Sequence, residues 1–102
     1  MAVAPQIGTF SFGDEPLNAG DATSLTCSVT KGDSPLEIVW MFNNVALNSQ
    51  KHRDIVVTET GKRTKQLSID FVNAKHAGEY TCVASNIAGS TSRSAILSVN
   101  GI

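Results

Sequence analysis

The chain of 102 residues contains few of the side chains on which catalytic and metal sites depend. It has two cysteines, two histidines, one tryptophan and one tyrosine. Because no C-x-x-C pair occurs, the spacing argues against a structural metal site. Neither His52 nor His76 shares a motif with a nucleophile, and no glycine-rich phosphate loop is present. We therefore expect no enzyme activity, no metal and no cofactor.

Strong charge and long apolar runs are also missing. A net charge of −1 gives no electrostatic reason to expect nucleic acid or a membrane surface as a partner. No stretch approaches the roughly 18 apolar residues that a membrane span requires. The start, Met1–Pro5, lacks the charged and apolar parts of a secretory signal, so we expect an expression start before an excised module. The length fits one domain over residues 4–100, with linker segments at 1–3 and 101–102.

The most informative residues are two cysteines with a tryptophan between them. Cys27 precedes Trp40, and the triplet Tyr80-Thr81-Cys82 follows. In a two-sheet β-sandwich a disulfide joins the sheets, an indole packs over it, and a tyrosine two residues before the second cysteine pins a corner. Cys27 and Cys82 are thus compatible with a structural disulfide, which persists in an oxidising compartment. Two buried free thiols, as in some cytoplasmic sandwich domains, are the alternative. No N-x-S/T glycosylation motif gives independent support for secretion.

Hydrophobicity alternates with a period of two along almost the whole chain. Residues 23–30 read as a half-buried strand, and similar segments follow at 36–42, 55–58, 65–71 and 91–99. Turn residues separate them, including Asn43-Asn44, Thr60-Gly61 and Asn86–Gly89. The pattern predicts an all-β, Greek-key sandwich of two antiparallel sheets with eight or nine short strands.

These residues together resemble the intermediate set of the immunoglobulin superfamily. The matching pieces are Cys27, Trp40, Leu67–Ile69, Ala77–Cys82 and Ala84–Gly89. Further segments resemble the seventh immunoglobulin domain of arthropod members of the Down syndrome cell adhesion molecule family: Ala4–Ile7, Phe10–Gly13, Leu25–Val29 and Lys31–Trp40. The resemblance implies homophilic recognition, in which modules bind identical copies on an opposing membrane during self-recognition by neurites.

One position departs from the family pattern. Many members carry an aspartate six residues before the second cysteine, paired with an arginine across the bottom of the sandwich. This chain has His76 there, so we expect the ion pair with a candidate such as Arg53 to be lost. The fold should survive, because exposed ion pairs contribute only about 0–1 kcal/mol.

Two basic clusters could form an anionic-glycan site. They are Lys51-His52-Arg53 and Lys62-Arg63 with Lys65. Charged side chains prefer solvated turns in any case. We therefore favour solvated hairpin tips over glycan binding.

The binding question rests on the two outer faces of the sandwich. Strand parity turns Val39, Met41, Val83 and Ile96 outward on one sheet, where exposed apolar residues commonly mark an interface. The other sheet presents a flat polar surface made of Ser24, Thr26, Ser28, Gln66, Ser68 and Asp70. The family resemblance implies antiparallel self-pairing through this second surface, the sheet of strands A, B, E and D, and we prefer it.

The sequence therefore predicts an extracellular adhesion module from the ectodomain of a cell-surface receptor, with secreted forms as a further option. Its expected partner is an identical copy, bound weakly by the isolated module, without nucleic acid or direct membrane contact. Two alternatives stay open: a structural spacer in a tandem receptor, and an intracellular muscle-type module with reduced cysteines.

Overall fold

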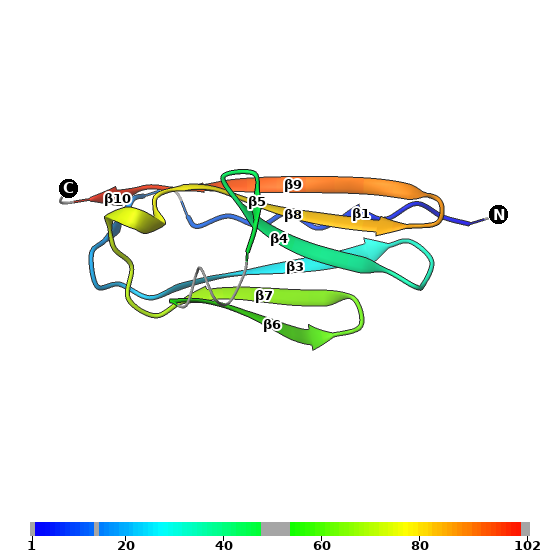
Figure 1. Cartoon of the computed structure of the whole chain (residues 1–102), viewed down its shortest axis with the longest axis horizontal. Helices are drawn as coiled ribbons and strands as arrows, with labels where there is room; N and C mark the ends of the chain where they lie inside the picture. The colour runs from blue at the N-terminus through cyan, green and yellow to red at the C-terminus, as the bar shows by residue number, and fades with distance from the viewer. Residues whose placement is uncertain (1, 14, 48–53, 101–102) are drawn as a thin grey trace.

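The computed structural model describes residues 2–13, 15–47 and 54–100. Within these ranges the chain forms ten strands and one 3-10 turn (Figure 1). In chain order they are β1 (Gln6–Ile7), β2 (Leu17–Asn18), β3 (Thr23–Lys31), β4 (Glu37–Phe42), β5 (Val45–Ala46), β6 (Ile55–Gly61), β7 (Thr64–Ile69), η1 (Ala74–His76), β8 (Gly78–Asn86), β9 (Gly89–Leu97) and β10 (Val99–Asn100). No helix among the described residues has the length and apolar character needed to cross a membrane.

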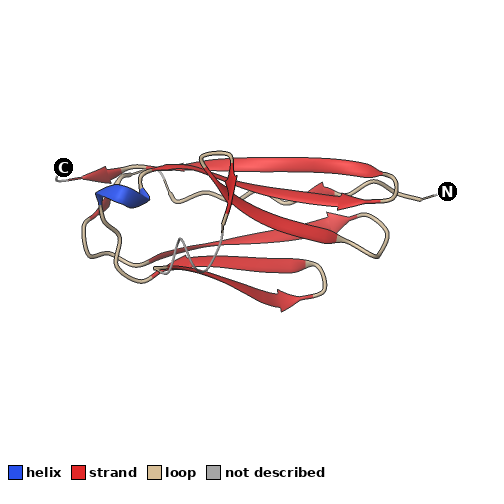
Figure 2. Ribbon diagram, viewed as in Figure 1, coloured by secondary structure: helices blue, strands red, loops and turns tan. Residues whose placement is uncertain are grey.

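The strands form two four-stranded antiparallel sheets, which confirms the predicted sandwich (Figure 2). One sheet has the order β1-β3-β7-β6 and the other the order β5-β4-β8-β9. A short parallel pair, β2 with β10, ties the first part of the chain to its last strand. Strand β1 lies at a sheet edge, as expected for a segment that begins with a proline lacking an amide hydrogen.

The core lies between the sheets and follows the predicted alternation. In the central parts of β3, β4, β7 and β8 every second residue is buried, because successive side chains of a strand point to opposite faces. The buried set includes Leu25, Cys27, Val29, Ile38, Trp40, Leu67, Ile69, Tyr80, Cys82 and Ala84. One face of each sheet is thereby committed to the core, and the other remains available for partners.

The turn between β6 and β7 differs from its prediction. The sequence predicted a turn at Thr60-Gly61, but β6 continues through Gly61 and the turn falls at Lys62-Arg63. The register between β6 and β7 shifts between Glu59 and Gly61. Gly61 therefore lies at an irregularity inside β6, where a strand can accommodate an extra residue. It does not end the strand. The predicted turn at Asn43-Asn44 is confirmed, since both residues have positive φ.

The predicted corner before β8 is the 3-10 turn η1. The buried phenol of Tyr80 donates a 2.7 Å hydrogen bond to the His76 carbonyl oxygen and so pins this corner to the core. Burial raises the pKa of the Tyr80 phenol well above its usual range, and the Asp54 carboxylate raises it further. The phenol thus keeps its proton and remains a donor.

His76 has hydrogen-bond partners on both ring nitrogens. Its Nε2 lies 2.6 Å from Asp54 Oδ2, and its Nδ1 accepts a hydrogen bond from the Asn73 backbone N–H. Because Nδ1 is an acceptor, the proton sits on Nε2 and is donated to Asp54. The family's aspartate–arginine pair is replaced by a histidine–aspartate pair, with the acidic partner on the opposite side. Arg53, the predicted candidate, lies outside the described residues.

Candidate functional site: the outer faces of the sandwich

The two sheets are held together by the predicted disulfide. The Cys27 and Cys82 sulfurs are bonded at 2.02 Å, and both side chains are fully buried. Trp40 lies opposite Cys82 in the strand register, and its indole N–H donates to the Lys65 carbonyl oxygen at 3.2 Å. Trp40 and Tyr80 are both buried in the core beside this bond. This rigid centre presents two outer faces with little freedom to rearrange.

We call the first of these surfaces the polar face, formed by the outward side chains of β3, β7 and β6. Ser24, Ser68 and Val56 lie side by side in one cross-strand row. The next row along the strands contains Thr26, Gln66 and Thr58, and Ser28 follows opposite Thr64. The structure thus brings together five of the six residues predicted for this surface. Their short side chains leave the sheet flat, which permits close approach by another flat sheet.

The sixth predicted residue, Asp70, lies just beyond the end of β7 and is exposed. The structure also adds Val56, whose side chain is 49% exposed beside Ser68. Successive side chains of β6 point to opposite faces of the sheet. Because Ile55 is buried, the Val56 side chain points outward. An exposed valine next to serines gives the polar face one apolar contact point.

Charge is divided between the two ends of the polar face. Asp21 and Asp70 lie at the end where Thr23 pairs with Ile69. Lys31 ends β3 at the other end, where Lys62 occupies the exposed β6–β7 turn. Neither Asp70 nor these lysines has a hydrogen-bond or ion-pair partner among the residues that the structure describes. The face therefore has an acidic end and a basic end. Asp70, Lys31 and Lys62 are free to meet charges on a partner, whereas Asp21 Oδ2 accepts a hydrogen bond from the Asn18 backbone N–H at 2.9 Å.

The opposite surface, which we call the apolar face, belongs to β4, β8 and β9. Val39 and Val83 are direct cross-strand neighbours, and Met41 follows along β4 opposite Thr81. All three are half-buried. Ile96 is 68% exposed but lies opposite Glu79, four residues along β8 from Val83 and so about 13 Å away. The predicted four-residue surface is therefore divided into a group of three and one separate isoleucine.

The second basic cluster is the predicted solvated hairpin tip only at Lys62, which is exposed in the β6–β7 turn. The Arg63 guanidinium donates to the carbonyl oxygens of Val29 and Gly32, at 3.1 and 2.8 Å. Lys65 Nζ donates to the Ile38 carbonyl oxygen at 2.6 Å. Only Lys62 of this cluster extends freely, because the other two cations satisfy backbone acceptors. The cluster at Lys51-His52-Arg53 lies outside the described residues.

The described part of the chain contains no group of three or more histidine, cysteine, aspartate or glutamate side chains that could hold a metal ion.

Known proteins resemble the chain over nearly its full length. The immunoglobulin domain family matches residues 5–86. The cell adhesion molecule Dscam1 of Drosophila melanogaster is 42% identical over 100 residues, which is 98% of this chain and 5% of that protein. The crystal structure of isoform 9 of the Dscam1 Ig7 domain is 41% identical, with a TM-score of 0.88 over 95% of this chain and 100% of that one. A structure of the eight N-terminal Ig domains of a DSCAM isoform is 36% identical, with a TM-score of 0.85; the match covers 97% of this chain and 12% of that one.

Proposed function

The chain belongs to the immunoglobulin domain family, and we propose that it is an extracellular recognition module of a cell-adhesion receptor that binds an identical copy of itself. The observation that carries this proposal is the flat polar face with opposite charges at its two ends. The similarity to the Dscam1 Ig7 domain supports it. The disulfide supports an oxidising, extracellular location.

The charge arrangement favours an antiparallel pair. In a twofold contact the same surface of each copy faces the other. Each charged group therefore needs a group of opposite charge on that same surface. When two polar faces pair antiparallel, Asp70 of one copy approaches Lys62 of the other, and the reverse holds at the opposite end. A parallel pair would instead bring like charges together, which is costly. The short serine and threonine side chains between the ends allow the sheets to approach closely.

The expected affinity is low. The three strands of the polar face span about 20 Å along their length, at about 3.3 Å per residue, and about 14 Å across, at about 4.8 Å per strand. Such a surface is smaller than the roughly 800 Å² per partner of a standard stable interface. We therefore expect a micromolar or weaker dimer of the isolated module. Several modules on one receptor would raise the apparent affinity through effective concentration.

Charge reversal at Asp70 tests the choice of face. Asp70→Lys is expected to weaken self-association about tenfold or more, because each dimer then contains two like-charge approaches to Lys62. Met41→Glu, on the apolar face, is expected to leave the dimer unchanged. Sedimentation velocity over a concentration series up to high micromolar measures both. Loss of the dimer in Met41→Glu with an intact dimer in Asp70→Lys would move the site to the apolar face.

The same series separates the proposal from its main alternative. A spacer module that binds nothing itself would sediment as a monomer at every concentration. That result for the unaltered chain would refute homophilic binding by this module, while its membership of the family would stand.

A further inference from the structure

A small groove of about 250 Å³ lies between β1 and β9, which run close to each other at one edge of the sandwich (Figure 1). Its lining residues come from these two strands and are Gln6, Ile7, Thr91, Ser92 and Arg93. Each strand is the last of its own sheet, so the groove is open to another molecule. Neither the polar face nor the disulfide core uses it.

Arg93 occupies a position of β9 that faces the inside of the sandwich. It lies opposite the fully buried Cys82, and Leu97, on the same side of β9, is buried as well. At this edge the arginine stays exposed, and its Nε donates a 2.8 Å hydrogen bond to the Ile7 carbonyl oxygen of β1. This bond holds one edge of the planar guanidinium against the backbone of the other sheet.

The outer edge of the same guanidinium is available for a ligand. Its Nη1 and Nη2 donors have no hydrogen-bond or ion-pair partner among the residues that the structure describes. The side chains of Thr91, Ser92 and Gln6 add hydroxyl and amide groups that are also unpaired within the described ranges. No aspartate or glutamate is among the described lining residues. The groove therefore presents a fixed positive charge and hydrogen-bond donors to an anion.

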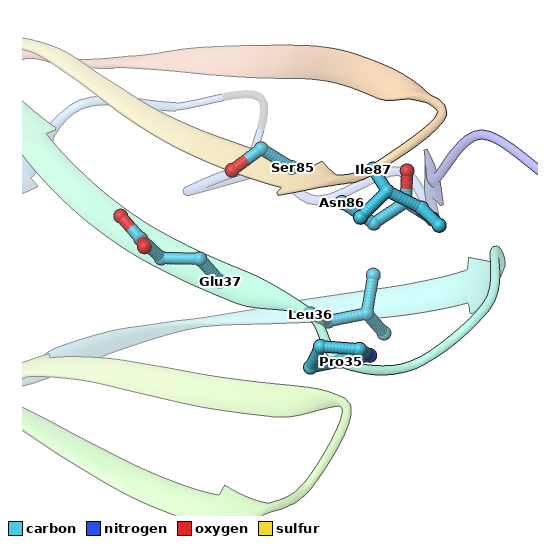
Figure 3. A pocket seen from close by; sticks show the side chains of 6 residues that line it. All are labelled: Pro35, Leu36, Glu37, Ser85, Asn86 and Ile87. Carbon is cyan, nitrogen blue, oxygen red and sulfur yellow. The ribbon is translucent and has the colours of Figure 1, made fainter.

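Other parts of the described structure lack this combination. A larger groove, of about 380 Å³, has Glu37 in its wall and no cationic side chain among its described lining residues (Figure 3). Arg63 donates to backbone carbonyl oxygens through both Nε and Nη2. Of the arginines in the described ranges, only Arg93 therefore keeps both terminal nitrogens free.

We propose that the groove between β1 and β9 binds the carboxylate of an aspartate or glutamate side chain on a protein partner. The fork of a guanidinium matches the two oxygens of a carboxylate, and such bidentate pairs are among the stronger hydrogen-bonded contacts. Because the Ile7 carbonyl oxygen already orients Arg93, less side-chain freedom is lost on binding. Thr91 and Ser92 lie in the same groove and can supply further hydrogen bonds.

The size and lining of the groove favour a protein side chain over an acidic sugar. Its volume is below the roughly 300–1,000 Å³ of pockets that enclose whole small ligands. No aromatic side chain on which a sugar ring could stack is among the described lining residues. The inference goes beyond homophilic pairing, because it assigns a second contact to the edge of the sandwich and not to the polar face.

NMR titration of the isotope-labelled chain with N-acetyl-glutamate-N-methylamide tests the proposal. We expect the Arg93 Nε–H signal and the backbone amides of Gln6, Thr91 and Ser92 to shift in a saturable way. The dissociation constant should be millimolar, because a single contact at an exposed site contributes little. The neutral N-acetyl-glutamine-N-methylamide should bind at least about tenfold more weakly. The Arg63 Nε–H signal should not move, because that guanidinium is already bound to the backbone.

Arg93→Lys keeps the charge and removes the fork, so we expect it to weaken binding about tenfold, measured on the three backbone amides. The matched control is Arg63→Lys, the same change at an arginine outside the groove, which should leave binding unchanged. Unchanged amide signals of Cys82 and Ala84 in the core show that each variant folds.

Three results would overturn the proposal: no saturable shift at Arg93, an equal response to the glutamine analogue, or an equal response to sodium chloride at the same ionic strength. Binding of methyl glucuronide about tenfold more tightly than the glutamate analogue would make an acidic sugar the occupant and also overturn it. Sedimentation decides homophilic binding separately. A strictly monomeric chain that still binds the glutamate analogue would refute homophilic binding and leave this inference intact.

Discussion

Replacing both Cys27 and Cys82 by alanine is expected to lower the free energy of unfolding by about 4 kcal/mol. The bond closes a loop with a sequence separation of 55 residues, and the chain-entropy model assigns about this value to such a loop. Single domains are stable by only about 5–15 kcal/mol, so the double variant should be marginal at 37 °C. Urea unfolding at 25 °C, followed by Trp40 fluorescence, measures the loss.

The disulfide prediction also decides between compartments. Intact mass under non-reducing conditions should be lower by two hydrogens than after reduction. A loss of stability below about 1 kcal/mol, well under the usual range for a structural disulfide, would contradict the account. It would favour the muscle-type alternative, in which the sandwich is stable with two thiols.

Ser68→Arg is expected to abolish measurable self-association of the isolated chain. Ser68 lies in the cross-strand row between Ser24 and Val56, where a long charged side chain would hold two flat sheets apart. A tenfold weaker dimer corresponds to about 1.4 kcal/mol, and separation of the sheets should cost more than that. Sedimentation velocity measures the dimer, and thermal melting confirms that the variant folds.

The matched control for this change is Ser92→Arg. Ser92 is an exposed serine on the outer side of β9, opposite Val83, and thus belongs to the other sheet. Ser92→Arg is therefore expected to leave the dimer unchanged. An equal loss in both variants would show that added charge, and not the position on the polar face, weakens association.

The sequence was sufficient for those parts of the fold that depend on alternation and on a few large side chains. The buried positions of β3, β4, β7 and β8 follow directly from period-two hydrophobicity, and Cys27, Trp40, Tyr80 and Cys82 lie where the pattern placed them. Outward direction was equally predictable, because parity fixes it once the inner face is known.

Register and local pairing could not be predicted in the same way. Alternation along the strands predicted that Ile96 and Val83 point to the same side of the sheet. Only the β8–β9 register shows that Ile96 lies opposite Glu79, away from Val83. The β6–β7 turn moved by two residues because Gly61 sits at an irregularity inside a strand. Arg63 and Lys65 bind carbonyl oxygens on distant strands, so their roles depend on tertiary contacts.

The contact between His76 and Asp54 could not be predicted from the sequence either. The family pattern identified the position, and the chain has a histidine where an acid is usual. Nothing in the residue pattern indicated that Asp54, 22 residues earlier, would lie 2.6 Å from its ring. A substitution at one end of a pair can be compensated by a residue whose position only the fold reveals.

The most direct test of antiparallel self-pairing is a mixing experiment with two single variants, Asp70→Lys and Lys62→Asp. Each variant alone should associate more weakly than the unaltered chain, since both ends of its dimer bring like charges together. In an equimolar mixture, a heterodimer restores two opposite-charge contacts. Sedimentation velocity should therefore detect more dimer in the mixture than in either variant alone at the same total concentration. A mixture that associates no better than its components would contradict the pairing of these two ends.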